Sequence, residues 1–423
     1  MRTDWFVHDR FGMFVHFGLY AVAARHEWVM NREEIEAGRY ARYADVFDPD
    51  LFDAAALART AKQAGARYVV LTAKHHEGFC LWDTATTDFS AARVCRRDLV
   101  REFVDALRAE GLRVGLYFSL LDWHHPDYTI DMHHPDRHRP DVAERNATRD
   151  MERYRTYLKA QVRELLTGYG TIDYLFFDFT EAAPEGSALP GRSARDWDAE
   201  ALMAMCRELQ PHMIVNDRLG IPGDLVTPEQ YQPSRPLERD GAPVLWEACQ
   251  TVNGSWGYDR DNLDVKTPEL LVRMLVGSVA LGGNMLLNVG PTGRGEIAPR
   301  DAALFAAIGE WMHRHRRAVH GAGPSAFTAP SGVTYTQRDD RLYACLFDWP
   351  FGLLHLPDLA GRVRFARLLH DGSELRMREI PQAQQAFNLN PAAPPPGTLT
   401  LTLPTQQPDV ALPVIELLLQ DGR

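Results

Sequence analysis

The residues that could do chemistry in this chain gather where apolar runs end. Asp178 closes the run Leu175–Phe177, where an ionised carboxylate is costly unless it is solvated or hydrogen-bonded. Polar or aromatic residues in comparable positions are His16, His75, His76, Tyr117, Asn216, Asp217, Arg218, Trp246, Glu247 and Trp256. In a parallel barrel the carboxyl ends of the strands meet at one face, so one cleft could gather all of them.

Asp178 has two interpretations on its residues alone. It could cap the amino end of a helix after the strand, because an Asp side chain accepts backbone N–H groups there. It could also be a catalytic carboxylate at a barrel mouth. Hydrolysis of a glycosidic bond uses two carboxyl groups, one that attacks or activates water and one that protonates the leaving oxygen. The candidates for the second group are Glu27, Glu77, Glu229 and Glu247.

Histidines are concentrated in the first third of the chain, where ten of the sixteen precede Arg139. A metal centre is one interpretation, but two neighbours on a strand, such as His75 and His76, point in opposite directions. The sequence also contains no His-Glu-x-x-His motif. Neutral imidazoles suit a hydroxyl-rich ligand, because each ring offers one donor and one acceptor. We therefore expect a site without a metal ion or a cofactor.

Four tryptophans lie beside polar candidates: Trp28, Trp123, Trp246 and Trp256. A sugar ring packs its C–H face on an aromatic ring and presents hydroxyl groups at its edge. Most tryptophans fill a core, but the adjacency of these four to polar residues favours sugar binding.

The elements that must position these residues alternate between strands and helices. Near-continuous apolar runs predict parallel strands covered on both faces at Met13–Gly18, Tyr68–Ala73, Arg113–Ser119, Tyr174–Phe179 and Met213–Asp217. Helical spacing of apolar residues predicts helices at Leu51–Ala64, Arg97–Glu110, Asn146–Thr167, Ala194–Glu208, Thr267–Leu281 and Arg300–Arg317. No Gly-x-Gly-x-x-Gly follows the first strand, which disfavours a dinucleotide-binding fold. The pattern predicts an α/β fold, a (β/α)8-like (TIM-type) barrel.

The sequence changes character after Gly321-Ala322-Gly323-Pro324. Short strand-like runs follow at Val333–Gln337, Arg341–Trp349, Val363–Leu369, Thr398–Leu403 and Val414–Leu419. The proline-rich stretch Asn388–Gly397 is a loop that no helix could cross. We expect two domains, a catalytic barrel over residues 1–322 and a C-terminal antiparallel β-sandwich over residues 330–423.

Composition excludes several classes of protein. The 423 residues carry a net charge of −11, so a nucleic-acid partner is not expected. No run of about 18 apolar residues is present, so a membrane partner is not expected either. The five cysteines are scattered without a Cys-x-x-Cys pair, and the first residues lack the pattern of a secretory signal. We expect a reduced, cytoplasmic enzyme.

Short segments spread over three quarters of the chain resemble one known family. In chain order they are Phe14–Tyr20, Glu27-Trp28, Ala73–Phe79, Gly115–Ser119, Asn216–Arg218, Trp246-Glu247, Asn253–Tyr258, Gly282–Asn284 and Leu287–Pro291. The ordered set resembles the α-L-fucosidases of glycoside hydrolase family 29. The resemblance implies a barrel followed by a β-sandwich, which agrees with the pattern of the elements.

The resemblance also implies a retaining exo-enzyme that removes terminal L-fucose from a fucosylated glycan or fucoside, without metal. It implies that Asp178 is the nucleophile and forms a covalent fucosyl intermediate. The substrate-binding residues that it implies are His16, Glu27, Trp28, His75, His76, Tyr117, Arg218 and Trp256, the last near the C5 methyl group.

Two features depart from the family pattern. The nucleophile usually lies between Trp and Gly, whereas Asp178 lies between Phe177 and Phe179. The acid/base position varies within the family, and two residues compete for it here. Glu229 lies on the loop after the fifth strand and is favoured; Glu247, in a strand-like run, is expected to be deeper and to orient the substrate.

Two other functions stay open. The pocket could take a related sugar such as an α-L-galactoside, because an apolar pocket discriminates poorly against one added hydroxyl group. The chain could also be an inactive fucose-binding protein, although the presence of Asp178 and of both candidate glutamates argues against it.

Overall fold

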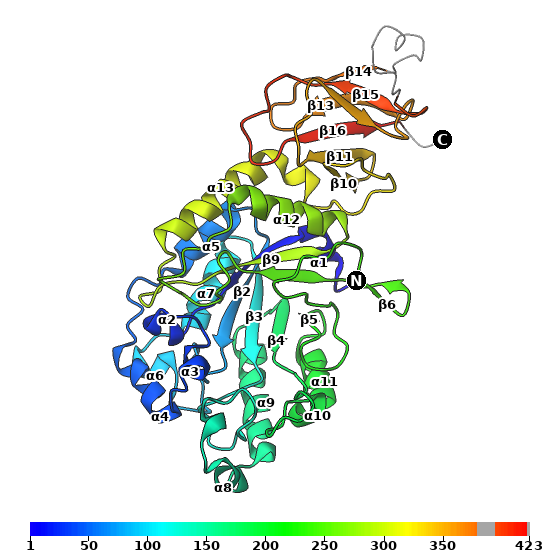
Figure 1. The fold of residues 1–423 in the computed structure, drawn as a ribbon. Helices are drawn as coiled ribbons and strands as arrows, with labels where there is room; N and C mark the ends of the chain where they lie inside the picture. The colour runs from blue at the N-terminus through cyan, green and yellow to red at the C-terminus, as the bar shows by residue number, and fades with distance from the viewer. Residues whose placement is uncertain (379–393, 421–423) are drawn as a thin grey trace.

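Seven parallel strands form a curled sheet that carries the candidate residues at its carboxyl edge (Figure 1). The computed structural model describes residues 1–378 and 394–420. The strands are β1 Phe11–Val15, β2 Tyr68–Lys74, β3 Arg113–Ser119, β4 Tyr174–Asp178, β5 Ile214–Val215, β8 Glu247–Gln250 and β9 Asn284–Val289. Their order across the sheet is β5-β4-β3-β2-β1-β9-β8. The predicted parallel α/β architecture is therefore confirmed.

Helices cover the outer face of this sheet, as Figure 1 shows for α5, α7, α9 and α13. The longer helices are α5 Ala54–Gln63, α7 Leu99–Ala109, α9 Met151–Gly168, α11 Ala199–Leu209, α12 Pro268–Ala280 and α13 Pro299–His315. Four of these helices, α5, α7, α9 and α12, are capped at their amino ends by a side chain that accepts a backbone N–H group. The capping residues are Asp53, Asp98, Asp150 and Thr267, respectively. The predicted helix Ala194–Glu208 is instead broken, because Asp198 has a φ of 50° between α10 (Ala194–Trp197) and α11.

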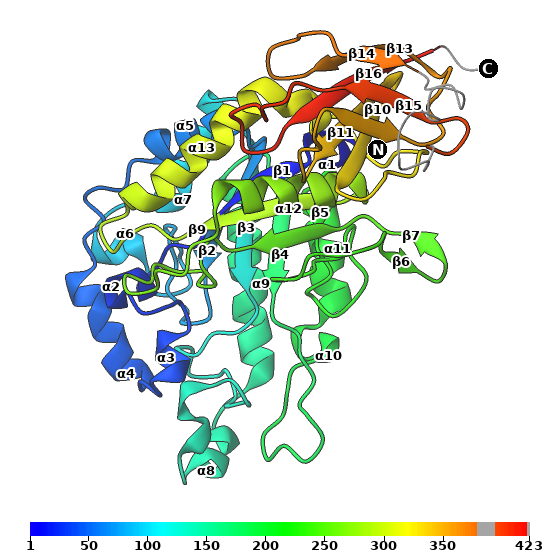
Figure 2. The same cartoon turned by 45° about the horizontal axis from the view of Figure 1, so that its top comes forward.

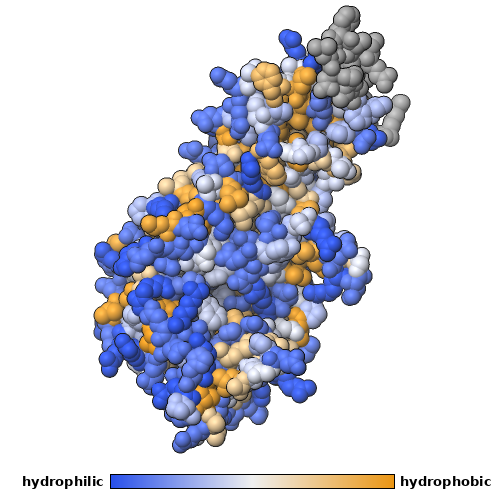
Figure 3. Space-filling model, viewed as in Figure 1, coloured by the Kyte–Doolittle hydropathy of each residue, from blue (hydrophilic) through white to orange (hydrophobic). Residues whose placement is uncertain are grey.

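The shorter elements surround this frame. They are α1 Asp4–Asp9, α2 Tyr20–Ala23, α3 Val29–Arg32, α4 Ala37–Tyr40, α6 Ala91–Val94 and α8 Val142–Ala147, the 3-10 turns η1 Ala41–Val46, η2 Pro135–His138 and η3 Arg316–Ala318, and the small strands β6 Glu238–Arg239 and β7 Ala242–Pro243. Hydrophilic residues cover most of the face shown in Figure 3. Within the described residues, no helix is both long enough and apolar enough to span a membrane.

The sheet does not close by a pairing between β5 and β8. Beside β8, the segment 226–230 follows the strand as an extended chain. The backbone N–H of Glu247 donates to the carbonyl of Val226 at 3.0 Å, and that of Cys249 donates to Pro228 at 3.0 Å. Gln230 in turn donates to the carbonyl of Cys249 at 3.0 Å. Glu229, one of the predicted catalytic residues, is thereby fixed to the edge of the sheet.

A second core fills the inside of the curled sheet, where side chains of alternate strand residues meet. Its members are Phe6, Phe14, Tyr68, Val70, Tyr117, Tyr174, Phe176, Ile214, Leu225, Cys249 and Leu286. Because side chains alternate between the two faces of a strand, Asp178 shares the inner face of β4 with Tyr174 and Phe176. The carboxylate therefore points into the hollow of the sheet rather than toward the outer helices.

The C-terminal strands form two antiparallel sheets beyond α12 and α13 (Figure 2). One contains β10 Val333–Arg338, β11 Arg341–Leu346, β16 Val414–Leu419 and β13 Val363–Leu368; the other contains β12 Leu353–Leu356, β15 Leu399–Thr402 and β14 Arg376–Arg378. Residues of both sheets share one apolar core. The five predicted strands of this region are found, whereas β12 and β14 are not predicted by the sequence. The first six residues of the proline-rich loop Asn388–Gly397 lie outside the described residues.

Candidate active site

A pocket with about 400 Å³ of empty space, open solvent included, lies at the carboxyl edge of the sheet. The residues that line it are Phe14, His16, Trp28, His75, His76, Tyr117, Phe176, Asp178, Phe179, Glu229, Cys249 and Trp256. The structure thus brings eight of the predicted site residues into one cavity. Arg218 joins them through its contacts with two of the lining residues.

Asp178 is the last residue of β4 and lines the pocket. Its Oδ2 accepts a hydrogen bond from the hydroxyl of Tyr117 at 2.9 Å, and its Oδ1 lies 3.2 Å from Nη1 of Arg218. No helix follows directly, since α10 begins at Ala194, so the capping interpretation is wrong. Burial raises the pKa of Asp178, while the Arg218 cation and the Tyr117 hydroxyl oppose that rise.

Arg218 connects Asp178 to the second candidate carboxylate. Its Nη2 lies 2.8 Å from Oε2 of Glu229, whose side chain is 40% exposed, against 16% for Asp178. The nearby carboxylates raise the pKa of Arg218, although its burial opposes this, so the cation persists between them. Asp178 is therefore enclosed, and Glu229 lies toward the solvent.

The histidines of the pocket are held in fixed orientations by polar neighbours. His16 follows β1, and its Nδ1 lies 2.6 Å from Oδ1 of Asn288. His76 follows β2, and its Nδ1 lies 2.7 Å from the hydroxyl of Ser119. Burial lowers the pKa of both rings well below the usual value, so both are neutral and can bind hydroxyl groups.

His75 and His76 do not point in opposite directions. Their ring centroids are 4.1 Å apart, and both rings line the pocket. The alternation expected of a strand does not apply, because β2 ends at Lys74, before the pair. His75 stacks on Tyr117 with centroids 5.5 Å apart. Among the described residues, no group of three or more His, Cys, Asp or Glu side chains is arranged to hold a metal ion.

Trp256 forms one wall of the pocket and packs on His16, with centroids 5.2 Å apart. Glu27 lies behind this wall. Its Oε2 accepts the backbone N–H groups of Trp256 at 3.0 Å and Gly257 at 2.8 Å. Burial raises the pKa of Glu27 to about 7. Glu27 is not among the lining residues, so in this structure it holds the tryptophan loop in place.

Trp28 and Phe179 form another part of the pocket lining, with ring centroids 5.5 Å apart. Phe179 has a φ of 91°, a backbone conformation that favours glycine and costs about 1–3 kcal/mol for other residues. The resemblance implies glycine at this position; Phe179 keeps a backbone conformation that suits glycine and adds a ring. That ring lies 5.3 Å from His76 and lines the pocket.

The structure does not bring Glu247 to the pocket. Glu247 is the first residue of β8 and lies at the amino ends of the strands, fully buried. Its carboxylate accepts hydrogen bonds from the hydroxyls of Tyr68 and Tyr174, the first residues of β2 and β4. Burial raises its pKa to about 7. The expectation that Glu247 orients the substrate does not fit this position.

Three lining residues are not singled out by the sequence: Phe14, Phe176 and Cys249. Phe14 and Phe176 each precede a recognised residue by two positions, so the strand period of two could have revealed them. Cys249 has no comparable signal. Its thiol is buried, and burial raises its pKa well above the usual value.

The chemistry available here is that of a glycoside hydrolase: one enclosed carboxyl group and one exposed carboxyl group, within a lining of imidazole and aromatic rings. A sequence model of the family described as Alpha-L-fucosidase matches residues 1–317. The chain belongs to this family, glycoside hydrolase family 29, and the resemblance drawn from its motifs is confirmed.

Curated relatives agree with this assignment. The chain is 30% identical to the tissue alpha-L-fucosidase of Rattus norvegicus, in an alignment that covers 93% of this chain and 87% of the rat protein. It is 29% identical to the tissue alpha-L-fucosidase of Homo sapiens, covering 83% of this chain and 77% of the human protein.

Solved structures are similar over nearly the whole length. Alpha-L-fucosidase isoenzyme 1 from Paenibacillus thiaminolyticus superposes with a TM-score of 0.91 at 43% identity, covering 100% of this chain and 99% of that one. A family 29 alpha-L-fucosidase from Bacteroides thetaiotaomicron, described as a trapped covalent intermediate with 2-fluoro-fucosyl fluoride in a Glu-to-Gln mutant, has a TM-score of 0.84 at 28% identity. It covers 99% of this chain and 96% of its own.

Proposed function

We propose that this chain is a retaining exo-α-L-fucosidase that releases terminal fucosyl residues through a covalent intermediate on Asp178. The observation that carries the proposal is the pair of carboxylates on one pocket wall, Asp178 enclosed and Glu229 exposed, with Arg218 between them. The trapped covalent intermediate described for the Bacteroides thetaiotaomicron relative supports the same chemistry.

In the first step, an ionised oxygen of Asp178 forms a bond to the anomeric carbon, and the glycosidic C–O bond breaks. Glu229 gives its proton to the departing oxygen. Arg218 and Tyr117 stabilise the carboxylate before attack, because both contact its oxygens.

In the second step, Glu229 takes a proton from a water molecule, whose oxygen bonds to the anomeric carbon while the ester to Asp178 breaks. Two displacements at one carbon retain its configuration. The neutral rings of His16 and His76 bind the sugar hydroxyls throughout, and Trp256 offers an apolar wall for the methyl group of fucose.

We also infer that the chain consists of a barrel domain and a C-terminal β-sandwich domain. The curled sheet and the segment 226–230 are consistent with a (β/α)8-like barrel over residues 1–322, since the backbone bonds of that segment extend the sheet beyond β8. Residues 330–423 are consistent with a β-sandwich, since two antiparallel sheets share one core within their described part.

The test uses Asp178→Ala and an aryl α-L-fucoside. We expect kcat to fall roughly 10³-fold or more, because without its nucleophile the enzyme cannot form the covalent intermediate. Proton NMR of the wild-type reaction should show α-L-fucose as the first product. A 2-fluoro-fucosyl fluoride trap should label the peptide that contains Asp178. Turnover near the wild-type value in Asp178→Ala, or a label on another peptide, contradicts the proposal.

A further inference from the structure

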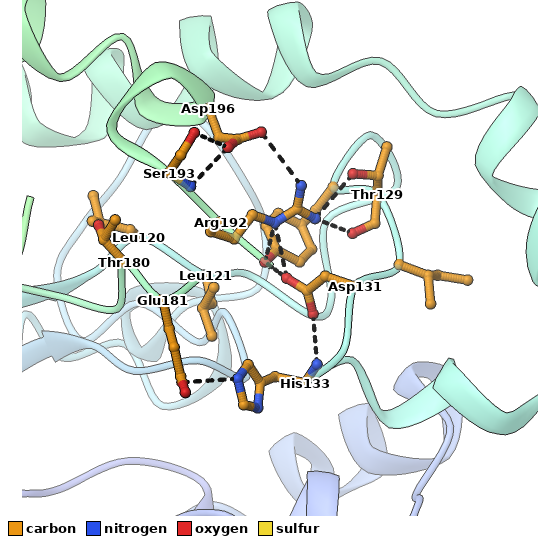
Figure 4. Close-up of polar contacts among 12 residues, drawn as sticks. Leu120, Leu121, Thr129, Asp131, His133, Thr180, Glu181, Arg192, Ser193 and Asp196 are labelled. Carbon is orange, nitrogen blue, oxygen red and sulfur yellow. Dashed lines mark hydrogen bonds and ion pairs between the residues drawn. The ribbon is translucent and has the colours of Figure 1, made fainter. Parts of the chain in front are cut away.

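Two loops rise beside the pocket at the carboxyl edge of the sheet, and a buried ion pair joins them. One loop follows β3, and the other follows β4 and runs to Ser193. Nε of Arg192 lies 2.9 Å from Oδ2 of Asp131, and the two side chains are only 4% and 0% exposed (Figure 4). Buried charges are retained where they are paired and hydrogen-bonded, as these are.

Every polar group of this ion pair that the structure places has a partner. Arg192 also donates to the hydroxyl of Tyr128 at 3.1 Å and to Oγ1 of Thr129 at 2.9 Å, and it bonds the carbonyl of Thr129. Its guanidinium lies over the ring of Tyr128, 4.5 Å from the centroid. The buried Arg192 side chain therefore holds the loop after β4 to residues 128–131 of the loop after β3.

This ion pair sets the position of His133. Oδ1 of Asp131 accepts the backbone N–H of His133 at 2.9 Å, so one carboxylate bonds both Arg192 and the turn that carries the histidine. On the other loop, the backbone N–H of Arg192 donates to the carbonyl of Glu181 at 2.7 Å. Nε2 of His133 then meets Oε2 of Glu181 at 3.1 Å (Figure 4).

The pair of His133 and Glu181 lies directly beside the aromatic wall of the pocket. The ring of His133 is 4.7 Å from that of Phe179 and 5.6 Å from that of Trp28. Phe179 is the residue that follows Asp178, and it lines the pocket. His133 and Glu181 do not line the pocket, yet both are accessible, with side chains 23% and 55% exposed.

We propose that His133 and Glu181 are the polar edge of an aglycone subsite whose apolar floor is the ring of Phe179, and that Arg192 and Asp131 are positioning residues for it. The inference rests on the proposed function, because an aglycone is defined only by cleavage at Asp178. Phe179, whose backbone is strained, lies where the fucose pocket and the proposed aglycone subsite meet.

The chemistry of this subsite selects a neutral sugar ring. An aromatic floor packs the C–H face of a pyranose, and a carboxylate with an imidazole binds hydroxyl or acetamido groups at its edge. A negatively charged aglycone would meet the carboxylate of Glu181. The occupant is therefore a hexose or N-acetylhexosamine unit that carries the fucose.

The test compares two substrates in one preparation: an aryl α-L-fucoside, which offers no hydroxyl edge, and fucosyl-N-acetylglucosamine disaccharides. We expect His133→Ala and Glu181→Ala each to lower the ratio of kcat/KM for the disaccharide over the aryl fucoside about tenfold, with the larger part in KM. The ratio does not depend on the fraction of folded enzyme. Glu185→Ala is the matched control, since Glu185 is exposed on the same loop, and its ratio should stay at the wild-type value.

The positioning role has its own readout. Arg192→Met should lower the same ratio. Arg192→Lys should give a ratio between those of Arg192→Met and the wild type, because lysine keeps the positive charge beside Asp131 but lacks the planar guanidinium group with its several donors. A ratio within twofold of wild type in both His133→Ala and Glu181→Ala overturns the subsite. Absence of fucose release from the aryl fucoside by the wild-type enzyme instead overturns the proposed function.

Discussion

Asp178 and Glu229 are held by the two ends of one guanidinium group, that of Arg218, at 3.2 Å and 2.8 Å. A cation between two carboxyl groups holds them at short range, because its attraction to each one offsets their mutual repulsion. Arg218 thus links the proposed nucleophile to the proposed acid/base before substrate enters.

Glu229→Ala should lower turnover of a fucosyl disaccharide by roughly 10²- to 10⁴-fold, the usual contribution of a general acid. Turnover of an activated aryl fucoside by this variant should recover in azide, because this anion attacks the anomeric carbon of the intermediate directly and needs no general base. Product analysis by mass spectrometry should find fucosyl azide. Glu247→Ala offers the comparison: recovery there, and none in Glu229→Ala, would reverse the assignment.

Tyr117→Phe removes a hydrogen bond that favours the ionised form of Asp178. The pKa of Asp178 should therefore rise, and the acidic limb of the kcat/KM profile should move to higher pH. A hydrogen bond to a charged group contributes about 1.5–3 kcal/mol, so kcat/KM on the acidic limb of the profile should fall roughly 10- to 100-fold. Titration of kcat/KM with an aryl fucoside from acid to neutral pH checks this. An unmoved limb contradicts the role given to Tyr117.

Glu247→Gln should stabilise the fold at alkaline pH. The folded pKa of Glu247 is about 7, raised from 4.5, so the folded state binds more protons between these values and loses stability as pH rises through them. The glutamine removes this loss, worth about 3 kcal/mol once pH exceeds 7. Urea unfolding of both proteins at pH 5 and pH 8 measures it. Stability differences that are equal at the two pH values contradict the buried, protonated state.

Glu27→Ala should release the loop that carries Trp256, since one carboxylate oxygen accepts two of its backbone N–H groups. We expect a fucose-configured iminocyclitol to bind roughly tenfold more weakly or worse. The inhibition constant is the measurement. Glu33→Ala, which breaks only an exposed ion pair with Arg25, serves as the control. Equal inhibition constants in Glu27→Ala and wild type show that Glu27 does not hold the loop.

Most of the site residues can be predicted from the sequence, because an apolar run followed by a polar residue indicates where a strand ends. Asp178 follows a run of apolar residues, and this alone predicts a carboxylate at the edge of a parallel sheet. The same reasoning failed for Glu247. The apolar residues before it suggested the end of a strand, whereas β8 begins at Glu247 and places it at the opposite edge.

The contact between His133 and Glu181, in the proposed aglycone subsite, could not be predicted from the sequence for a different reason. His133 and Glu181 lie 48 positions apart on two irregular loops, and no periodic pattern relates such residues. Their contact depends on the buried pair of Arg192 and Asp131. In the sequence, these two charged residues cannot be distinguished from the exposed charged residues that are common in loops. Only the structure shows that the side chains of Arg192 and Asp131 are buried.

The buried thiol of Cys249 has a practical consequence for inhibitor chemistry. Sulfur reacts with electrophiles as the thiolate, and the raised pKa of this group keeps it protonated at any working pH. Maleimides and haloacetamides should therefore leave the enzyme active even though a cysteine faces the ligand cavity. A covalent probe has to be built around an activated anomeric centre, with oxygen as its target.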